Sequence, residues 1–438
     1  MKKATLAYGF VFGRSPLLSL AELENFLARE NMDVEWLAAS KQGALVRNIA
    51  MNDPQALLDK LGGSVRVVEV LDRISLPDLK NFNIPLTEAL QADIMTRDYL
   101  GETDKNKITF GFSTFYMDET PKNLQRDVTA FLRQRARKIK QDLKSRKRSS
   151  RFVQTVKMDA SLSSVQLRKQ GIFNKNGLEW CVFFSGEQAY IGRTIAVQDF
   201  ESYGKRDYER PYRNPKVGML PPKIAQMMLN MTGKPEGAKI LDPYCGLGTV
   251  IQEGLMMGYS VSGSDIDGKL VEQSKANLDW LKENYADKVV TEYGVAKGDA
   301  RKVSAKLKKE SIDAIVTESF LGPAYSVLPS SENIDDNFRK INRLHAQVLT
   351  SIRQVLKTDG VVVLILPFYR NPRNPQETAV FPYLDNILEV GYSVRQPISK
   401  ALQGVSGITI PERGTLFYAR PQQIVGREIV ILERKERN

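Results

Sequence analysis

The chain has 438 residues, 42% of them hydrophobic and 26% charged, so it can bury real cores and is long enough for two or three domains. Its net charge of +12 points to a polyanionic partner, nucleic acid first, although a basic surface that only keeps the protein soluble gives the same total. Two distant cysteines, no secretory leader and no long apolar run exclude a disulfide-stapled, secreted or membrane-spanning protein. We therefore expect a cytoplasmic protein.

The N-terminal 70 residues alternate between strand and helix patterns. Alternating and β-branched apolar residues predict strands at 5–12, 43–48 and 65–71, and apolar residues at helical spacing predict helices at 17–30 and 54–61. This order predicts a small α+β unit.

Residues 71–200 are predicted to form a second α+β unit. Strand patterns fall at 107–116, 151–156, 179–185 and 188–193, and a helical pattern spans 122–148. The helix has one buried stripe at helical spacing, made of Val128, Phe131, Leu132, Ile139 and Leu143.

The second half of this helix is strongly basic. From Arg133 to Arg151 there are ten lysines and arginines against one acid, Asp142. Such a run is often only a solvated face, but here the basic residues continue past the predicted helix end without acids four residues on. Clustered Lys and Arg gain affinity for polyanions by counterion release. We expect phosphate contacts from Arg133, Arg137, Lys144, Arg146, Lys147, Arg148 and Arg151.

Residues 201–218 are rich in Tyr, Arg and Pro and are predicted to be a linker, because the prolines bias the chain away from helix. Basic and aromatic residues alternate in this segment, as in a surface that contacts the backbone and bases of RNA. An ordinary interdomain strap, with its tyrosines packed on both neighbours, fits the same composition.

The C-terminal half, 219–438, alternates strands with helices. Nearly continuous apolar strands predict a doubly wound, mostly parallel α/β sheet with a ligand site at the carboxyl ends of its strands. Strand patterns lie at 239–242, 260–265, 289–296, 312–317 and 360–366, and 416–432 predicts a closing hairpin. Helices are expected after the first two strands, as far as residues 257 and 285, and over 337–356.

The first of these strands ends in Asp242, and the turn after it contains Gly246 and Gly248. Glycines let a backbone approach a ligand closely and adopt unusual φ values. A dinucleotide-binding turn has the same look, but Ile251 occupies the final glycine position of that fingerprint. An acidic residue at the start of the turn suits the ammonium group of S-adenosylmethionine, directly or through water.

Two more aspartates follow the next two strands. Asp265 is placed to accept both hydroxyls of a ribose, and Asp299 to accept from the exocyclic amine of an adenine. One such residue is easily a surface turn, but three at the ends of successive strands are harder to explain in that way. The predicted S-adenosylmethionine site comprises Asp242, Tyr244, Cys245, Gly246, Gly248, Thr249, Asp265, Ile266, Asp299 and Ala300.

Three segments resemble motifs I, II and III of the THUMP-domain RNA methyltransferases: Asp-Pro-Tyr-Cys-Gly-Leu-Gly-Thr at 242–249, Gly-Ser-Asp-Ile-Asp at 263–267 and Gly-Asp-Ala at 298–300. With Arg210-Pro211 and the segment 218–225, they are most similar to the archaeal and eukaryotic tRNA guanosine-10 N2-methyltransferases.

The resemblance implies a ferredoxin-like α+β element at 1–70 and a THUMP domain at 71–200 that grips the acceptor end of a tRNA. After the linker it implies a Rossmann-like, S-adenosylmethionine-dependent methyltransferase domain at 219–438. Whether a small activating subunit is needed stays open.

Family members that methylate exocyclic amines end the fourth strand with Asp/Asn-Pro-Pro-Tyr/Phe. A side-chain oxygen and a backbone carbonyl accept the protons of the poorly nucleophilic amine, and the aromatic ring stacks on the flipped base. Here Glu318 matches the charge but is one methylene longer, Ser319 replaces the first proline, and Phe320 comes one residue early. The resemblance implies that Glu318 accepts from the amine and Phe320 stacks, with a less rigidly aimed carbonyl.

The predicted function is methylation of the N2 amine of a guanosine in tRNA, with position 10 supplied by the resemblance alone. Three alternatives stay open: a catalytically silent RNA-binding relative, a DNA amino-methyltransferase, and a nicotinamide-dependent enzyme. His345, the only histidine, is expected to be a satisfied helix residue, and Cys245 to pack rather than act as a nucleophile. No metal site is predicted.

Overall fold

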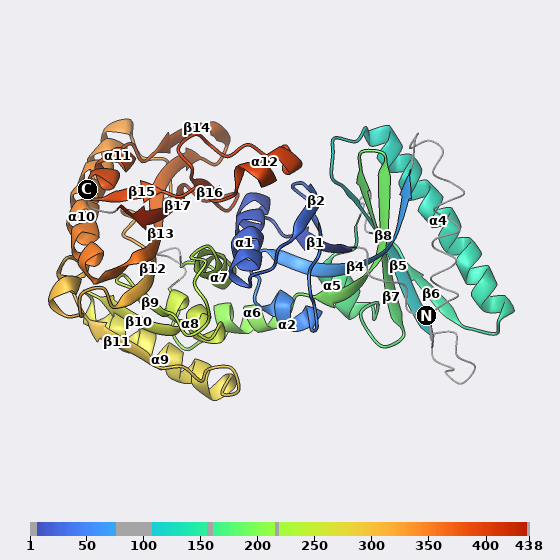
Figure 1. Cartoon of the computed structure of the whole chain (residues 1–438), viewed down its shortest axis with the longest axis horizontal. Coiled ribbons are helices and arrows are strands. Elements are labelled where there is room, and N and C mark those ends of the chain that lie inside the picture. The colour runs from blue at the N-terminus through green and yellow to red at the C-terminus, as the bar shows by residue number, and fades with distance from the viewer. Residues whose placement is uncertain (1–6, 76–106, 156–160, 215–218, 436–438) are drawn as a thin grey trace.

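The computed structural model describes residues 7–75, 107–155, 161–214 and 219–435. Two sheets lie at opposite ends of an elongated molecule, one of eight strands in the N-terminal half and one of nine strands in the C-terminal half (Figure 1). Within the described ranges, no helix combines the length and the apolar character needed to cross a membrane.

The N-terminal sheet has the strand order β2-β3-β1-β4-β8-β7-β5-β6. Its strands are β1 (Ala7–Phe12), β2 (Glu35–Ala39), β3 (Gly43–Arg47), β4 (Ser64–Ser75), β5 (Ile108–Tyr116), β6 (Ser150–Val153), β7 (Gly177–Ser185) and β8 (Gln188–Val197). All were predicted except the short β2. Residues 5, 6 and 156, at the ends of two predicted strands, lie outside the described residues.

The two predicted N-terminal units share this one sheet, which crosses the boundary expected after residue 70. β4 runs through that position without a break and pairs with β8 in antiparallel register from Arg66 to Ser75. β4 is a central strand because both of its faces are apolar: Val67 packs in one core cluster, and Val68 packs in another on the opposite face.

Among the described residues, the helices that accompany this sheet are α1 (Pro16–Arg29), α2 (Pro54–Asp59), α4 (Lys122–Ser145) and α5 (Ser164–Lys169). α4 connects the parallel strands β5 and β6 and buries the predicted apolar stripe, joined by Ala136, against the sheet. Its other face is exposed, and α4 lies at the end of the molecule farthest from the C-terminal sheet (Figure 1). α5 was not predicted.

A continuous core joins the two halves. Phe26 of α1 belongs to the same buried cluster as Met228 of α7 (Pro222–Asn230) and Ile240 of the C-terminal sheet. At the centre, the carboxylate of Glu22 accepts hydrogen bonds from the amides of Gly62 and Gly63, at 2.8 and 2.7 Å, and from the side chain of Asn230 at 2.7 Å. Burying a carboxylate is favourable only with such partners, so this contact fixes one arrangement of the halves.

The C-terminal sheet has the order β11-β10-β9-β12-β13-β17-β15, with β14 paired to β13 and β16 to β17. The first five strands are parallel; β17 is antiparallel to β13, and β15 pairs antiparallel with β17 and so runs in the direction of the first five. The strands are β9 (Lys239–Asp242), β10 (Ser260–Asp265), β11 (Tyr293–Lys297), β12 (Ile312–Glu318), β13 (Leu356–Asn371), β14 (Asn374–Val380), β15 (Tyr392–Val394), β16 (Leu416–Tyr418) and β17 (Val425–Arg434).

Helices cover both faces of this sheet. They are α8 (Thr249–Met256), α9 (Gly268–Asn284), the 3-10 helix η4 (Ala300–Ala305), α10 (Ser331–Val355), α11 (Leu384–Glu389) and α12 (Lys400–Ser406). The predicted doubly wound fold and its closing hairpin, β16 with β17, are confirmed.

The predicted linker 201–218 is helical at its start, which is a correction. α6 (Phe200–Tyr208) begins at an Asp199 cap, whose side chain accepts from the amide of Ser202 at 3.1 Å. The helix ends before Pro211, so the prolines terminate it and do not prevent it.

Candidate active site

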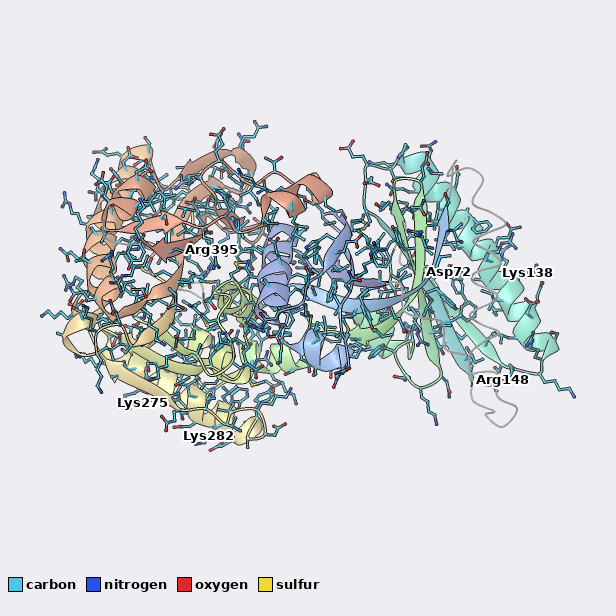
Figure 2. The ribbon with its side chains drawn as sticks, in the orientation of Figure 1. Asp72, Lys138, Arg148, Lys275, Lys282 and Arg395 are labelled. Carbon is cyan, nitrogen blue, oxygen red and sulfur yellow. The ribbon has the colours of Figure 1, made fainter. Side chains whose placement is uncertain are left out.

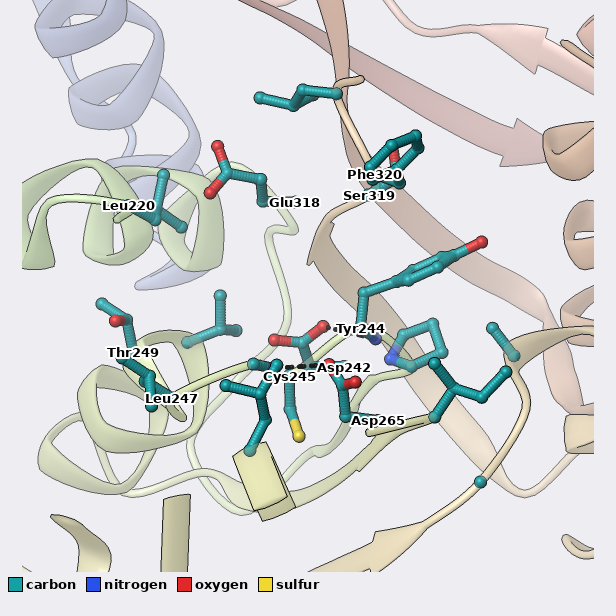
Figure 3. Close-up of a pocket in the computed structure, with 18 of the residues that line it drawn as sticks. Leu220, Asp242, Tyr244, Cys245, Leu247, Thr249, Asp265, Glu318, Ser319 and Phe320 are labelled. Carbon is teal, nitrogen blue, oxygen red and sulfur yellow. Dashed lines mark hydrogen bonds between the residues drawn. The ribbon is translucent and has the colours of Figure 1, made fainter. Parts of the chain in front are cut away.

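A cavity of about 650 Å³ opens at the carboxyl ends of β9, β10 and β12 (Figure 3), where doubly wound sheets bind ligands. Nine of the ten predicted cofactor residues and both predicted catalytic residues line it, and only Gly248 does not. The cavity also has lining residues that were not predicted, among them Met219, Leu220, Arg301 and Leu344.

The glycine turn after β9 has the form expected. Gly246 and Gly248 have φ values of 50° and 82°, and a Cβ on Gly248 would lie 2.4 Å from the hydroxyl oxygen of Ser274. Gly248 therefore requires glycine, and the left-handed conformation of Gly246 favours it. Cys245 packs against Gly263 of β10, and burial raises the pKa of its thiol, so the interpretation of Cys245 as a packing residue stands.

Asp242 is buried at the floor of the cavity. One of its oxygens accepts from the amide of Tyr244 at 3.1 Å and from the hydroxyl of Thr317 at 2.6 Å. Burial raises the pKa of Asp242 to about 7, against the effect of these hydrogen bonds. A cationic group placed in the cavity would stabilise the ionised carboxylate.

Asp242→Asn is therefore expected to stabilise the free protein at alkaline pH. The folded pKa is raised above the ordinary value, so the stabilising contribution of Asp242 is complete in acid and is lost as pH rises through about 7. Denaturant unfolding should show a variant about 4 kcal/mol more stable than wild type at pH 8 and nearly equal to it at pH 4. Exposed Asp287→Asn is the control, and a difference between Asp242→Asn and wild type that does not change with pH would contradict the interpretation.

The other two aspartates are engaged differently. Asp265 accepts from the amides of Gly246 and Asp267, each at 3.0 Å, and so ties the glycine turn to the end of β10. Asp299 pairs with Arg301, whose terminal nitrogen lies 2.6 Å from the carboxylate. Asp299 also lines the cavity, and a carboxylate can accept from more than one donor, so its expected role toward an adenine amine stays a prediction beside this ion pair.

Glu318 ends β12 and projects into the cavity (Figure 3). Its carboxylate lies 2.5 Å from the Nε of Arg427, which is almost completely buried on β17. Burial raises the pKa of Glu318, and the charge of Arg427 opposes that effect. Sequence reasoning missed Arg427, because it lies 109 residues away on the closing strand and no local pattern links the two.

Ser319 is buried and holds the loop after β12 in place. Its hydroxyl donates to the carbonyl of Ile365 at 3.1 Å and lies 2.8 Å from Nε2 of His345. Because the serine proton is used on Ile365, His345 donates from Nε2 and is neutral, and burial lowers its pKa to about 4. The expectation of a satisfied helix histidine holds only for Nε2, since Nδ1 has no partner within the described residues.

Ser319→Ala is expected to lower the free energy of unfolding by about 2 kcal/mol, because it leaves the buried Nε2–H of His345 without an acceptor. Ser319→Ala with His345→Leu should recover most of that loss, since both polar partners are then gone. Denaturant unfolding of the two variants tests this. Equal stability of the single variant and wild type would show that the hydrogen bond contributes nothing.

Phe320 is 54% exposed although it lines the cavity. An exposed ring at a cavity mouth is available to stack on a planar ligand group. Its position next to Ser319 puts the ring on a loop that β13 and α10 hold from both sides.

The segment 200–214 separates into buried and exposed parts. Arg206 and Tyr203 are buried, and Arg206 pairs with both oxygens of Glu253, so neither is available to RNA, which corrects part of the expectation. Tyr208 is 61% exposed and carries the guanidinium of Arg213 over its ring at 4.6 Å. The interdomain strap and the exposed basic-aromatic surface are thus both present, in consecutive parts of one segment.

The basic residues of α4 do not join this cavity. Arg133, Arg137 and Lys144 are exposed on the outer face of the helix, where Figure 2 also shows Lys138 projecting outward. They lie at the opposite end of the molecule from the carboxyl ends of β9 and β12 (Figure 1). In the described parts of the chain, no cluster of His, Cys, Asp or Glu has the composition of a metal site.

The chain matches the family model for the RMKL-like methyltransferase domain over residues 210–379. It is 30% identical over 210 residues to the tRNA (guanine(10)-N2)-dimethyltransferase of Methanothermobacter thermautotrophicus, covering 48% of this chain and 53% of that protein. It is also 30% identical over 142 residues to a Methanothermococcus thermolithotrophicus protein named "Probable tRNA (guanine(10)-N2)-dimethyltransferase", covering 32% of this chain and 77% of that relative. The chain therefore belongs to the family of RMKL-like methyltransferases.

Family membership confirms the predicted resemblance and sets aside the nicotinamide-dependent alternative. The chain spans about half the length of the first curated relatives that it matches. TrmN from Thermus thermophilus has a similar fold over 98% of this chain and 99% of its own, with a TM-score of 0.52 and 15% identity. That likeness confirms the fold class alone.

Proposed function

We propose that this chain is a cytoplasmic S-adenosylmethionine-dependent methyltransferase that acts on the exocyclic N2 amine of a guanosine in tRNA, at position 10. The observation that carries the proposal is one cavity that holds both halves of such a site. The glycine turn and its aspartates line one part of the cavity, and Glu318 and Phe320 line another (Figure 3).

The residues of the cavity fit the cofactor. Asp242 offers a buried carboxylate to an ammonium group, and Asp265 has lone pairs beyond those used by Gly246 and Asp267 to accept from ribose hydroxyls. The hydroxyl of Tyr244 is buried and has no partner within the described residues, as expected of a group that awaits a polar ligand. When bound there, S-adenosylmethionine supplies an electrophilic methyl group on its sulfonium.

Glu318 provides the acceptor for the target amine. The lone pair of an aromatic amine is delocalised into its ring, so a carboxylate that accepts an amine proton restores nucleophilic character to the nitrogen. Arg427 fixes the orientation of that carboxylate from behind. The backbone carbonyl that follows Glu318 belongs to Ser319. The hydroxyl of Ser319 donates a hydrogen bond to the carbonyl of Ile365, and this bond restrains the loop where relatives have a proline ring.

Phe320 provides the stacking surface for the base. A guanine lifted out of its helix loses its neighbours, and an exposed aromatic ring replaces part of that stacking. The Tyr208–Arg213 pair in the segment 200–214 offers a further planar, basic surface for nucleotides.

The Glu318–Arg427 ion pair also favours a second candidate, a catalytically silent RNA-binding relative. A carboxylate already neutralised by an arginine is a weaker acceptor for an amine proton than a free one. The two candidates share cofactor and RNA binding and differ only in turnover.

Transfer of a labelled methyl group from S-adenosylmethionine to unmodified tRNA, with duplex DNA in parallel, tests the proposal. We expect label in tRNA alone, recovered by mass spectrometry as N2-methylated guanosine at position 10; a second methyl on the same nitrogen would match the relatives' names. Cofactor binding without transfer would establish the silent candidate, provided that added cell extract, as a source of an activating subunit, does not restore transfer. Label in DNA would overturn the tRNA assignment.

A further inference from the structure

Two cations without acidic partners lie at the junction of the two halves of the molecule. Arg14 comes just before α1, and Lys223 lies in the first turn of α7. Arg14 is exposed and makes no hydrogen bond or ion pair with the described residues. Lys223 is half-buried, and its hydrogen-bond partner among those residues is the side-chain oxygen of Gln198, which is neutral. Neither charge is therefore balanced by a carboxylate in the described part of the chain.

The loop 62–63 brings these two cations together. The carbonyl of Gly63 accepts from the amide of Gly13 at 2.8 Å, directly before Arg14. Gly62 lies against the backbone of Lys223, so closely that an added Cβ would be 2.4 Å from the carbonyl oxygen of Lys223. The charges of Arg14 and Lys223 thus come from distant parts of the sequence to one place.

The electrostatic surroundings of Lys223 are positive. Burial lowers the pKa of Lys223 to about 8, and the charges of Arg14 and Arg206 act in the same direction, so the ammonium is still present at neutral pH. The acids of the junction have other partners: Glu253 pairs with Arg206, and Glu22 accepts from two backbone amides and an amide side chain. Like charges held together in this way favour an anionic ligand.

The ends of two helices add to this positive potential. The first turns of α1 and α7 both lie against the loop 62–63, through Ser19 and Lys223. At their other ends, Arg29 of α1 donates to the side-chain oxygen of Asn230 of α7 at 3.0 Å. The two helices therefore run in the same direction, and neither has a side-chain cap at its N-terminal end. Helix N-termini carry a partial positive charge.

The two cations lie on the route between the cavity and the N-terminal half. Leu220 lines the cavity, and α7 begins only two residues later (Figure 3). α1 and α7 lie between the two sheets, whereas α4 lies at the far end of the N-terminal half (Figure 1). A nucleic acid that contacts α4 and places a base in the cavity must therefore cross this junction.

We propose that Arg14 and Lys223 bind a backbone phosphate of the tRNA, between the part held at α4 and the nucleotide in the cavity. This inference rests on the proposed function. A phosphate supplies the negative charge that both side chains lack. Its oxygens also accept from the ammonium protons of Lys223 that are not used on Gln198.

Fluorescence anisotropy of labelled tRNA at several salt concentrations tests the site. Arg14→Gln combined with Lys223→Met is expected to weaken tRNA binding by about 20-fold at physiological salt, and to lower the slope of log affinity against log salt by about one. S-adenosylmethionine binding, measured by calorimetry, should not change. Lys308→Gln combined with Lys309→Met is the matched control, because it removes the same charge from exposed positions at the amino end of β12. This control should bind tRNA within about twofold of wild type.

If the Arg14–Lys223 double variant binds tRNA no more weakly than the control, the site is overturned and the proposed function is left intact. Failure of the wild-type chain to bind tRNA would instead overturn the proposed function.

Inorganic phosphate is a second calorimetric probe. If the double variant loses binding of inorganic phosphate but binds tRNA as wild type does, the site holds a free anion and its assignment to RNA is overturned. Circular dichroism monitors folding. Because Arg14 is exposed and makes no contact that folding requires, Arg14→Gln alone, with an expected loss of about fivefold, decides the question if Lys223→Met does not fold.

Discussion

Glu318→Gln is expected to lower the rate of methyl transfer to tRNA by about 10³-fold while S-adenosylmethionine binding stays within about threefold of wild type. The amide has no negative charge to offset the positive charge that develops on the attacking nitrogen, and its NH₂ group competes with the amine protons. Single-turnover transfer at saturating cofactor measures the first effect, and calorimetry measures the second.

Stability must be separated from catalysis in this test, because Glu318→Gln removes the charge that Arg427 faces in a buried site. We expect a loss of about 3 kcal/mol in the free energy of unfolding. Glu318→Gln combined with Arg427→Met should recover stability and stay inactive. Exposed Glu283→Gln, in the same domain, is the control. A wild-type rate in Glu318→Gln would show that Glu318 is not the acceptor.

Replacing Arg133, Arg137 and Lys144 together with glutamine is expected to weaken tRNA binding by about 10²-fold at physiological salt, and to leave S-adenosylmethionine binding unchanged. Fewer phosphates are then neutralised and fewer counterions are released on binding, so the slope of log affinity against log salt should fall by about two. Filter binding or fluorescence anisotropy at several salt concentrations measures both quantities.

A second triple variant distinguishes local contacts from total charge. Lys282, Lys308 and Lys309 are exposed on the methyltransferase half, and the last two precede β12 at its amino end, away from the cavity. Changing them to glutamine removes the same net charge. If this variant weakens tRNA binding as much as the α4 variant does, α4 is not a specific contact surface.

The fold followed from the sequence wherever local pattern decides structure. Continuous apolar strands alternating with helices predicted the C-terminal sheet, and the apolar stripe of α4 predicted its buried face. The residue pattern of β4 predicted a strand, but the pattern does not show which strand pairs with β4. The pairing of β4 with β8 joins residues more than a hundred positions apart. α6 was missed because Tyr, Arg and Pro in one segment suggested a linker, and because the partner of its Arg206, Glu253, is distant in the sequence.

The candidate site divides in the same way. Asp242, Asp265 and the glycine turn were predicted because strand ends and ligand chemistry are both visible in a short motif. The contacts of Glu318 and Ser319, which depart from the family motif, were not predicted. Their partners come from later strands and helices: Arg427 for Glu318, and His345 and Ile365 for Ser319. These partners determine whether the motif with Ser in place of Pro is held rigidly. The rigidity of this loop therefore depends on tertiary contacts, which a short motif does not show.

The core shared by α1, α7 and the C-terminal sheet sets a fixed separation between the outer face of α4 and the mouth of the cavity. A nucleic acid that contacts both places must span that fixed distance. If tRNA binds as we propose, we expect its target nucleotide to be selected by its distance from the end held at α4 more than by the sequence around it. Adding or removing one base pair between the two would carry the correct base past the cavity and present another in its place.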